Sequence, residues 1–121
     1  MISGIYRKIS KNCRDCKINL DGLPCDKVRN TFPISVIKEH IANKLDVNAD
    51  KLIHCDAMLK VSGKDRSGYF IIYYFNDNVD ETMTMQAVED KVCGDNGFID
   101  AVIISITFSD NEGNKYEWDC E

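Results

Sequence analysis

Apolar residues in the first half of the chain change from helical to extended spacing near residue 50. From residue 34 the apolar positions recur every three or four residues, which predicts an amphipathic helix with its stripe at Ile34, Ile37, Ile41 and Leu45. Pro33 suits the first turn of that helix, and Asp46 with the polar residues after it predicts its end. Residues 52–61 and 69–75 then predict two strands joined by the turn SGKDRSG.

The second half of the chain shows the same order. Asp80 is a helix-capping residue type, and it predicts a helix that runs to about Cys93. Residues 98–108 are β-branched and apolar, which is typical of a central strand. After the turn DNEGN, residues 115–120 alternate between charged and apolar side chains, as in a half-buried strand.

Together the two halves predict an α+β fold with approximate αββ-αββ order. We expect an antiparallel sheet of four or five strands with two helices on one face. A shift of 47 residues superposes several apolar positions of the two units, such as Ile41 on Val88 and Leu59 on Ile106, but only three superposed pairs are identical, which is no more than chance supplies. The shift therefore indicates a structural pseudo-repeat and does not show shared ancestry. Residues 2–9 fit either a helical stripe or an edge strand.

The length of 121 residues predicts a single domain, residues 1–121, large enough to bury a hydrophobic core. A net charge of −5 argues against a generic nucleic-acid or membrane-surface binder, which would be basic. That charge is unevenly distributed. The irregular, cysteine-containing segment 1–33 carries +4, the first αββ unit (34–79) is neutral, and the second (80–121) carries −9. Nucleic acid is therefore expected as a partner only through residues 1–33.

The sequence predicts a soluble, cytoplasmic protein with no membrane partner. Residues 1–20 lack the apolar stretch of a secretory signal, and the longest apolar run, residues 70–75, is far shorter than the roughly 18 residues of a membrane span. In the cytoplasm, the six cysteines favour reduced thiols or a metal site over a disulfide framework.

Cys13, Cys16 and Cys25 form the sharpest local motif. Two thiolates at CxxC spacing can bind one zinc ion, and Cys25 would be the third ligand. The fourth ligand would be one of His40, His54, Cys55 and Cys93. A disulfide within residues 10–33 and ordinary reduced thiols are the alternatives, since the sequence has no second CxxC and no HxxxH. We expect no other cofactor.

No catalytic constellation is evident, so we expect a non-enzymatic protein. His54 and Cys55 are adjacent in a predicted strand, where their side chains point to opposite faces and cannot act together. Cys55 is most simply a core residue. The aromatic residues of 69–75 could stack on RNA bases, but the acidic strands that follow favour a core role for them. A catalytic or small-molecule-binding domain with a dispersed site, for example around His40 and Tyr73, is the alternative.

The acidic second half supplies the candidate partner-binding residues. Seven carboxylates with few local counter-ions form this set: Glu89, Asp90, Asp95, Asp110, Glu112, Glu117 and Asp119. A surface of one sign attracts a partner of the opposite sign and speeds association. The general solubility of an acidic protein would explain the same charges.

The predicted function is therefore a small protein–protein interaction domain. We expect an inhibitor of the immunity or anti-defence type, whose acidic surface binds a basic, nucleic-acid-acting target. A zinc-stabilised nucleic-acid-binding module formed by residues 1–33 is one alternative. Another is a homo-oligomer in which the basic front of one copy meets the acidic back of the next.

Overall fold

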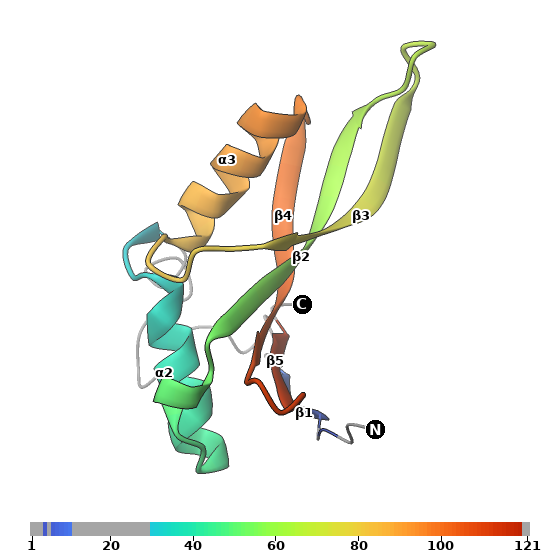
Figure 1. Ribbon diagram of the computed structural model, residues 1–121. Coiled ribbons are helices and arrows are strands. Elements are labelled where there is room, and N and C mark those ends of the chain that lie inside the picture. Colours follow the sequence, from blue (N-terminus) through green and yellow to red (C-terminus); the bar gives the residue numbers. More distant parts are fainter. Residues whose placement is uncertain (1–3, 5, 11–29, 120–121) are drawn as a thin grey trace.

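The computed structural model describes Gly4, residues 6–10 and residues 30–119. Its elements are β1 (Tyr6–Ser10), α2 (Ile34–Leu45), the short 3-10 helix η2 (Ala49–Lys51), β2 (His54–Lys64), β3 (Phe70–Asn78), α3 (Met85–Asn96), β4 (Asp100–Ser109) and β5 (Lys115–Asp119), as Figure 1 shows. A largely antiparallel sheet with separate helices places the fold in the predicted α+β class.

The five strands form one sheet in the order β1-β5-β4-β2-β3. The pairs β5–β4, β4–β2 and β2–β3 are antiparallel, and the β2–β3 and β4–β5 pairs are hairpins. β1 instead pairs in parallel with β5, with Tyr6 opposite Lys115 and Ser10 opposite Asp119. The prediction of an antiparallel sheet is therefore wrong for this one pair. Hairpin geometry does not constrain a strand that joins the sheet from far away in the sequence, so residue patterning left its direction open.

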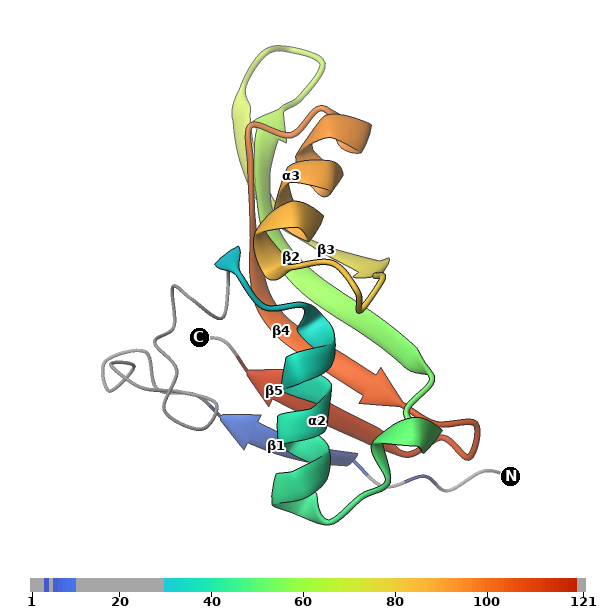
Figure 2. The same cartoon turned by 90° about the vertical axis from the view of Figure 1, so that its left-hand side faces the viewer.

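Both helices lie on one face of the sheet, as Figure 2 shows. Alternate residues of the strands meet them there and form the core with the apolar stripes of the helices. The most buried members are Ile34, Ile37, Ile41, Leu52, Ala57, Leu59, Val61, Ile103, Ile106 and Phe108. No helix in the described ranges is both long and apolar enough to cross a membrane. We call the other side of the sheet, which carries residues such as Lys60 and Val102, the open face.

A β-bulge in β4 interrupts the alternation of its side chains. Met58 of β2 lies opposite Ser105, whereas the next residue, Leu59, lies opposite Ile103, so Ile104 is the extra residue. Because of this insertion, Ile103 and Ile106 both point into the core although they are three positions apart. A pure period-two pattern would have placed them on opposite faces.

The second helix begins at Met85, one turn later than predicted. Thr84 is its N-cap, and the Thr84 side-chain oxygen accepts a hydrogen bond from the backbone N–H of Ala87 at 3.1 Å. The expectation that Asp80 caps this helix was wrong, although both residues are capping types. An isolated β-bridge to Pro33 holds Thr84 in extended backbone, and this tertiary contact determines which residue caps the helix.

Candidate functional site

The structure separates the seven predicted partner-binding carboxylates into several places. Asp90 and Asp95 are exposed on α3, on the helix side of the sheet. Asp110 and Glu112 lie in the β4–β5 turn. Glu117 and Asp119 are half-buried on β5, where they are successive residues on the open face of the sheet. The set therefore does not form one continuous surface.

Glu89 is buried, with 5% of its area exposed, so it cannot belong to an exposed docking surface as the sequence suggested. Its Oε2 atom accepts a hydrogen bond from the backbone N–H of Ile103 at 2.7 Å. Ile103 lies just beyond the part of β4 that pairs with β5, and among the described residues no strand partner is placed beside it on that side. Glu89 therefore has a structural role, because it supplies an acceptor to the end of a strand ladder.

A small acidic groove lies between the end of β3 and the side of α3. It has a volume of about 50 Å³, and its charged lining residues are Asp77, Asp80, Lys91 and Asp95, which define the acidic groove. Lys91 Nζ lies 3.8 Å from Asp95 Oδ2, and both side chains are about two-thirds exposed. Such an exposed pair contributes little to stability, so its charges remain available to a partner.

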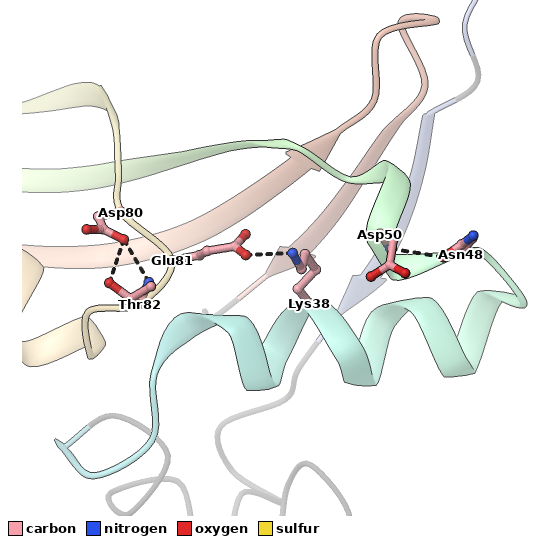
Figure 3. Close-up of polar contacts among 6 residues, drawn as sticks. All are labelled: Lys38, Asn48, Asp50, Asp80, Glu81 and Thr82. Carbon is pink, nitrogen blue, oxygen red and sulfur yellow. Dashed lines mark hydrogen bonds and ion pairs between the residues drawn. The ribbon is translucent and has the colours of Figure 1, made fainter.

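Asp80 is held in place by the turn that precedes α3. Its Oδ1 atom accepts hydrogen bonds from the backbone N–H of Thr82 at 2.9 Å and from the Thr82 hydroxyl at 2.7 Å, as drawn in Figure 3. The hydroxyl bond is the main cause that lowers the pKa of Asp80 below its usual value, and the backbone bond adds to it. This carboxylate is therefore ionised, and its position in the acidic groove is defined.

Asp110 has a comparable anchoring role in the β4–β5 turn. Its side chain accepts hydrogen bonds from the backbone N–H groups of Glu112 and Asn114 and from the Asn114 amide. The Asn114 side chain is the main cause that lowers the pKa of Asp110. The turn chemistry alone explains why an acid occupies this position.

A second groove, of about 500 Å³, contains the only ion pair between α2 and the segment after β3 that the described residues show. Lys38 Nζ and Glu81 Oε1 lie 2.6 Å apart at its wall (Figure 3), and Cys55 also lines this groove. Burial raises the pKa of the Cys55 thiol to about 12, and the negative charges of Glu81 and Asp56 add to the effect. The thiol therefore stays protonated at neutral pH and is a poor nucleophile, as expected for a core cysteine.

His54 does not complete a catalytic pair with Cys55. It is exposed, and its Nε2 atom lies 3.2 Å from Oδ1 of Asn111 in the β4–β5 turn. The two residues are adjacent in β2, and only Cys55 points into the core. This arrangement agrees with the prediction that they cannot act together.

The proposed zinc ligands Cys13, Cys16 and Cys25 lie outside the described residues. Among the residues that the structure does describe, no three His, Cys, Asp or Glu side chains are placed to hold a metal ion. Cys93 is half-buried on α3, and burial is the main cause that raises the pKa of its thiol. The zinc hypothesis thus stays a prediction.

Among the described residues β3 is an edge strand, and its aromatic residues other than Phe75 are exposed, which corrects the expectation that they form core. On the open face Phe70, Ile72 and Tyr74 are 59%, 55% and 64% exposed. On the helix face Tyr73 and Phe75 each contact the Phe98 ring in a T-shaped arrangement, with centroid distances of 5.7 and 5.5 Å. In Figure 1 the β2–β3 hairpin extends past the end of α3, so that the helix covers only part of this strand.

Sequence reasoning found Asp95 but missed Asp77 and Asp80 as part of an acidic groove. Both stand at the end of β3 and in the turn after it, and α3 returns alongside them only in the folded chain. The available signal was that polar and acidic residues follow directly after an apolar strand. Comparison of the chain with models of protein families, with curated proteins and with solved structures finds no match.

Proposed function

We propose that this protein is a small, non-enzymatic interaction domain that inhibits a basic, nucleic-acid-acting protein in the cytoplasm, as immunity and anti-defence proteins do. The observation that carries the proposal is the pair of exposed acids on α3, Asp90 and Asp95. Asp90 lies on the side of the helix toward β4, and Asp95 borders the acidic groove formed with Asp77 and Asp80. A basic target would be drawn to these carboxylates.

The size of the acidic groove supports a protein partner over a small molecule. Ligand pockets usually measure about 300–1,000 Å³, whereas this groove measures about 50 Å³. A space of that size suits the end of one basic side chain. Lys91 and Asp95 form only a long, exposed contact, so a partner's Lys or Arg can replace Lys91 beside Asp95 at little cost.

The charge distribution of the chain is the second support. Residues 80–121 carry eleven acids and two lysines, Lys91 and Lys115. Charges of this kind act mainly on the association rate, which rises when the two potentials are complementary. An inhibitor that must bind its target before the target reaches nucleic acid benefits from such a rate.

The test compares capture of protein from the natural host by three forms of the full chain. These are the wild type, the variant Asp90→Asn/Asp95→Asn, and the matched control Glu39→Gln/Asp50→Asn, which removes the same charge from exposed acids elsewhere. The captured protein should be basic, should act on nucleic acid, and should lose that activity when the wild-type chain is added.

The affinity of the purified pair should fall about threefold to tenfold in the α3 variant, mostly through slower association, and should stay near wild type in the control. Binding should also weaken as salt concentration rises. A captured target that is acidic, or whose affinity is indifferent to salt and to the α3 variant, would contradict the proposal.

A further inference from the structure

The outer edge of β3 is a feature that the acidic groove does not explain. Within the part of the chain that the structure describes, β3 pairs with β2 alone. The strand runs for nine residues, Phe70–Asn78, without a register shift against β2. It contains no proline, and no charged residue occurs before Asp77. Natural edge strands are usually protected by charges, prolines or bulges, so an edge of this kind is expected to be covered in solution.

The alternation of hydrogen bonds between β2 and β3 shows which backbone groups of β3 are available to pair with another strand. The N–H of Asp65 donates to the carbonyl of Tyr69, and the N–H of Val79 donates to the carbonyl of Cys55. In an antiparallel pair the bonded positions alternate, so the odd residues of β3 face β2. The even residues, which include Phe70, Ile72 and Tyr74, therefore direct their N–H and C=O groups away from the sheet.

We propose that β3 pairs antiparallel with β3 of a second copy of this chain, so that the two sheets join into one across a two-fold axis. The pairing closes with itself, because the same edge serves both copies. With the axis at Tyr73, Ile72 of one copy lies opposite Tyr74 of the other, and the two Tyr73 residues lie opposite each other. These positions bring together aromatic and β-branched residues, which are favourable cross-strand pairs.

The charges at the two ends of β3 favour a second copy of this chain as the partner that covers its edge. Lys64, the last residue of β2, and Arg66 in the turn precede the N-terminal end of β3, whereas Asp77 lies at its C-terminal end and Asp80 follows it. Asp65, at the N-terminal end, is engaged within its own turn, where its Oδ1 atom accepts hydrogen bonds from the N–H groups of Ser67 and Tyr69. Antiparallel pairing about a two-fold axis brings each basic end next to the acidic end of the other copy.

Apolar side chains along the edge add to the pairing. Six large apolar residues in a row are exposed or half-buried: Phe70, Ile71, Ile72, Tyr73, Tyr74 and Phe75. Their side chains project from the two faces of the sheet, so edge-to-edge pairing buries the flanks where cross-strand neighbours such as Ile72 and Tyr74 touch and leaves the outer surfaces in solvent. The backbone hydrogen bonds of the new ladder come in addition.

Two measurements on the full chain test the proposal: sedimentation over a series of protein concentrations, and hydrogen exchange measured at single backbone amides. We expect a monomer–dimer equilibrium, with the even amides from Phe70 to Asn76 exchanging slowly in the dimer and rapidly on dilution. A chain that stays monomeric at all concentrations would overturn the proposal. A dimer in which these amides remain unprotected would also overturn it, and so would protection that requires a different protein.

The variant Ile72→Lys tests the same interface by placing a charge beside the second copy's Tyr74, and we expect at least a tenfold weaker dimer. Val102→Lys is the matched control, because Val102 is also on the open face and 39% exposed, but lies on the inner strand β4. Equal dimerisation of wild type and Ile72→Lys would refute the pairing. The proposal does not rest on the proposed function, since its readout is the oligomeric state of this chain alone.

Discussion

Replacing Glu89 by leucine removes the acceptor from the backbone N–H of Ile103. Glu89 is 5% exposed and Ile103 is 1% exposed, so water cannot easily replace the lost acceptor. The contact is short, at 2.7 Å, as expected for a hydrogen bond to a carboxylate. A buried N–H left without a partner costs about 1–3 kcal/mol, and we expect Glu89→Leu to lower the free energy of unfolding by this amount.

Urea unfolding of the full chain measures this change through the fluorescence of Trp118, the single tryptophan, which lies on β5 and is buried in the core. Asp90→Leu is the control because Asp90 is the neighbouring acid on α3 but is exposed, so its replacement should change stability by no more than about 0.5 kcal/mol. Glu89→Gln keeps an oxygen acceptor and should fall between the two.

Equal stability of Glu89→Leu and Asp90→Leu would refute the structural role of Glu89. Hydrogen exchange at the Ile103 amide gives an independent readout, since this amide should exchange faster in Glu89→Leu than in wild type. If Glu89→Leu were as stable as wild type while weakening partner binding, Glu89 would belong to the binding surface after all.

Three further outcomes follow from the local geometry. Thr84→Ala removes the cap on the N–H of Ala87 and should lower the free energy of unfolding by about 1 kcal/mol, measured by urea denaturation. The Cys55 thiol should resist a thiol reagent at pH 8 in the native protein but react after unfolding, as peptide mass spectrometry can show. Since its pKa is raised to about 12, its contribution to stability is complete below the ordinary thiol pKa and is lost as pH rises toward 12. The lowered pKa of Asp110 acts in the opposite direction: its contribution to stability is present above the ordinary carboxyl pKa and is lost as pH falls through the pKa of the folded state. A titration followed by carboxyl NMR should show the lowered pKa, and the variant Asn114→Ala should make the shift smaller.

The sequence by itself determined the α+β class, the extent of α2 and the two hairpins. Ile34, Ile37 and Ile41 repeat at helical spacing and are all buried, because one stripe of an amphipathic helix must face the sheet. The two faces of β5 were also predicted from the sequence, since Tyr116 and Trp118 alternate with charged residues and are buried as that pattern predicts. These features depend on local periodicity.

Tertiary structure alone decided where Glu89, the acids of the acidic groove and the aromatic residues of β3 lie. Glu89 reads as a surface acid, but in the folded chain it is buried and accepts a hydrogen bond from the backbone N–H of Ile103 on β4. The aromatic run of β3 reads as core, but β3 takes the edge of the sheet, where no strand in the described ranges covers it. Periodicity tells which side chains share a face, whereas strand order decides which faces and edges meet water. The uneven charge of the chain is likewise a property of its sequence, but only folding brings Asp77, Asp80 and Asp95 around one groove.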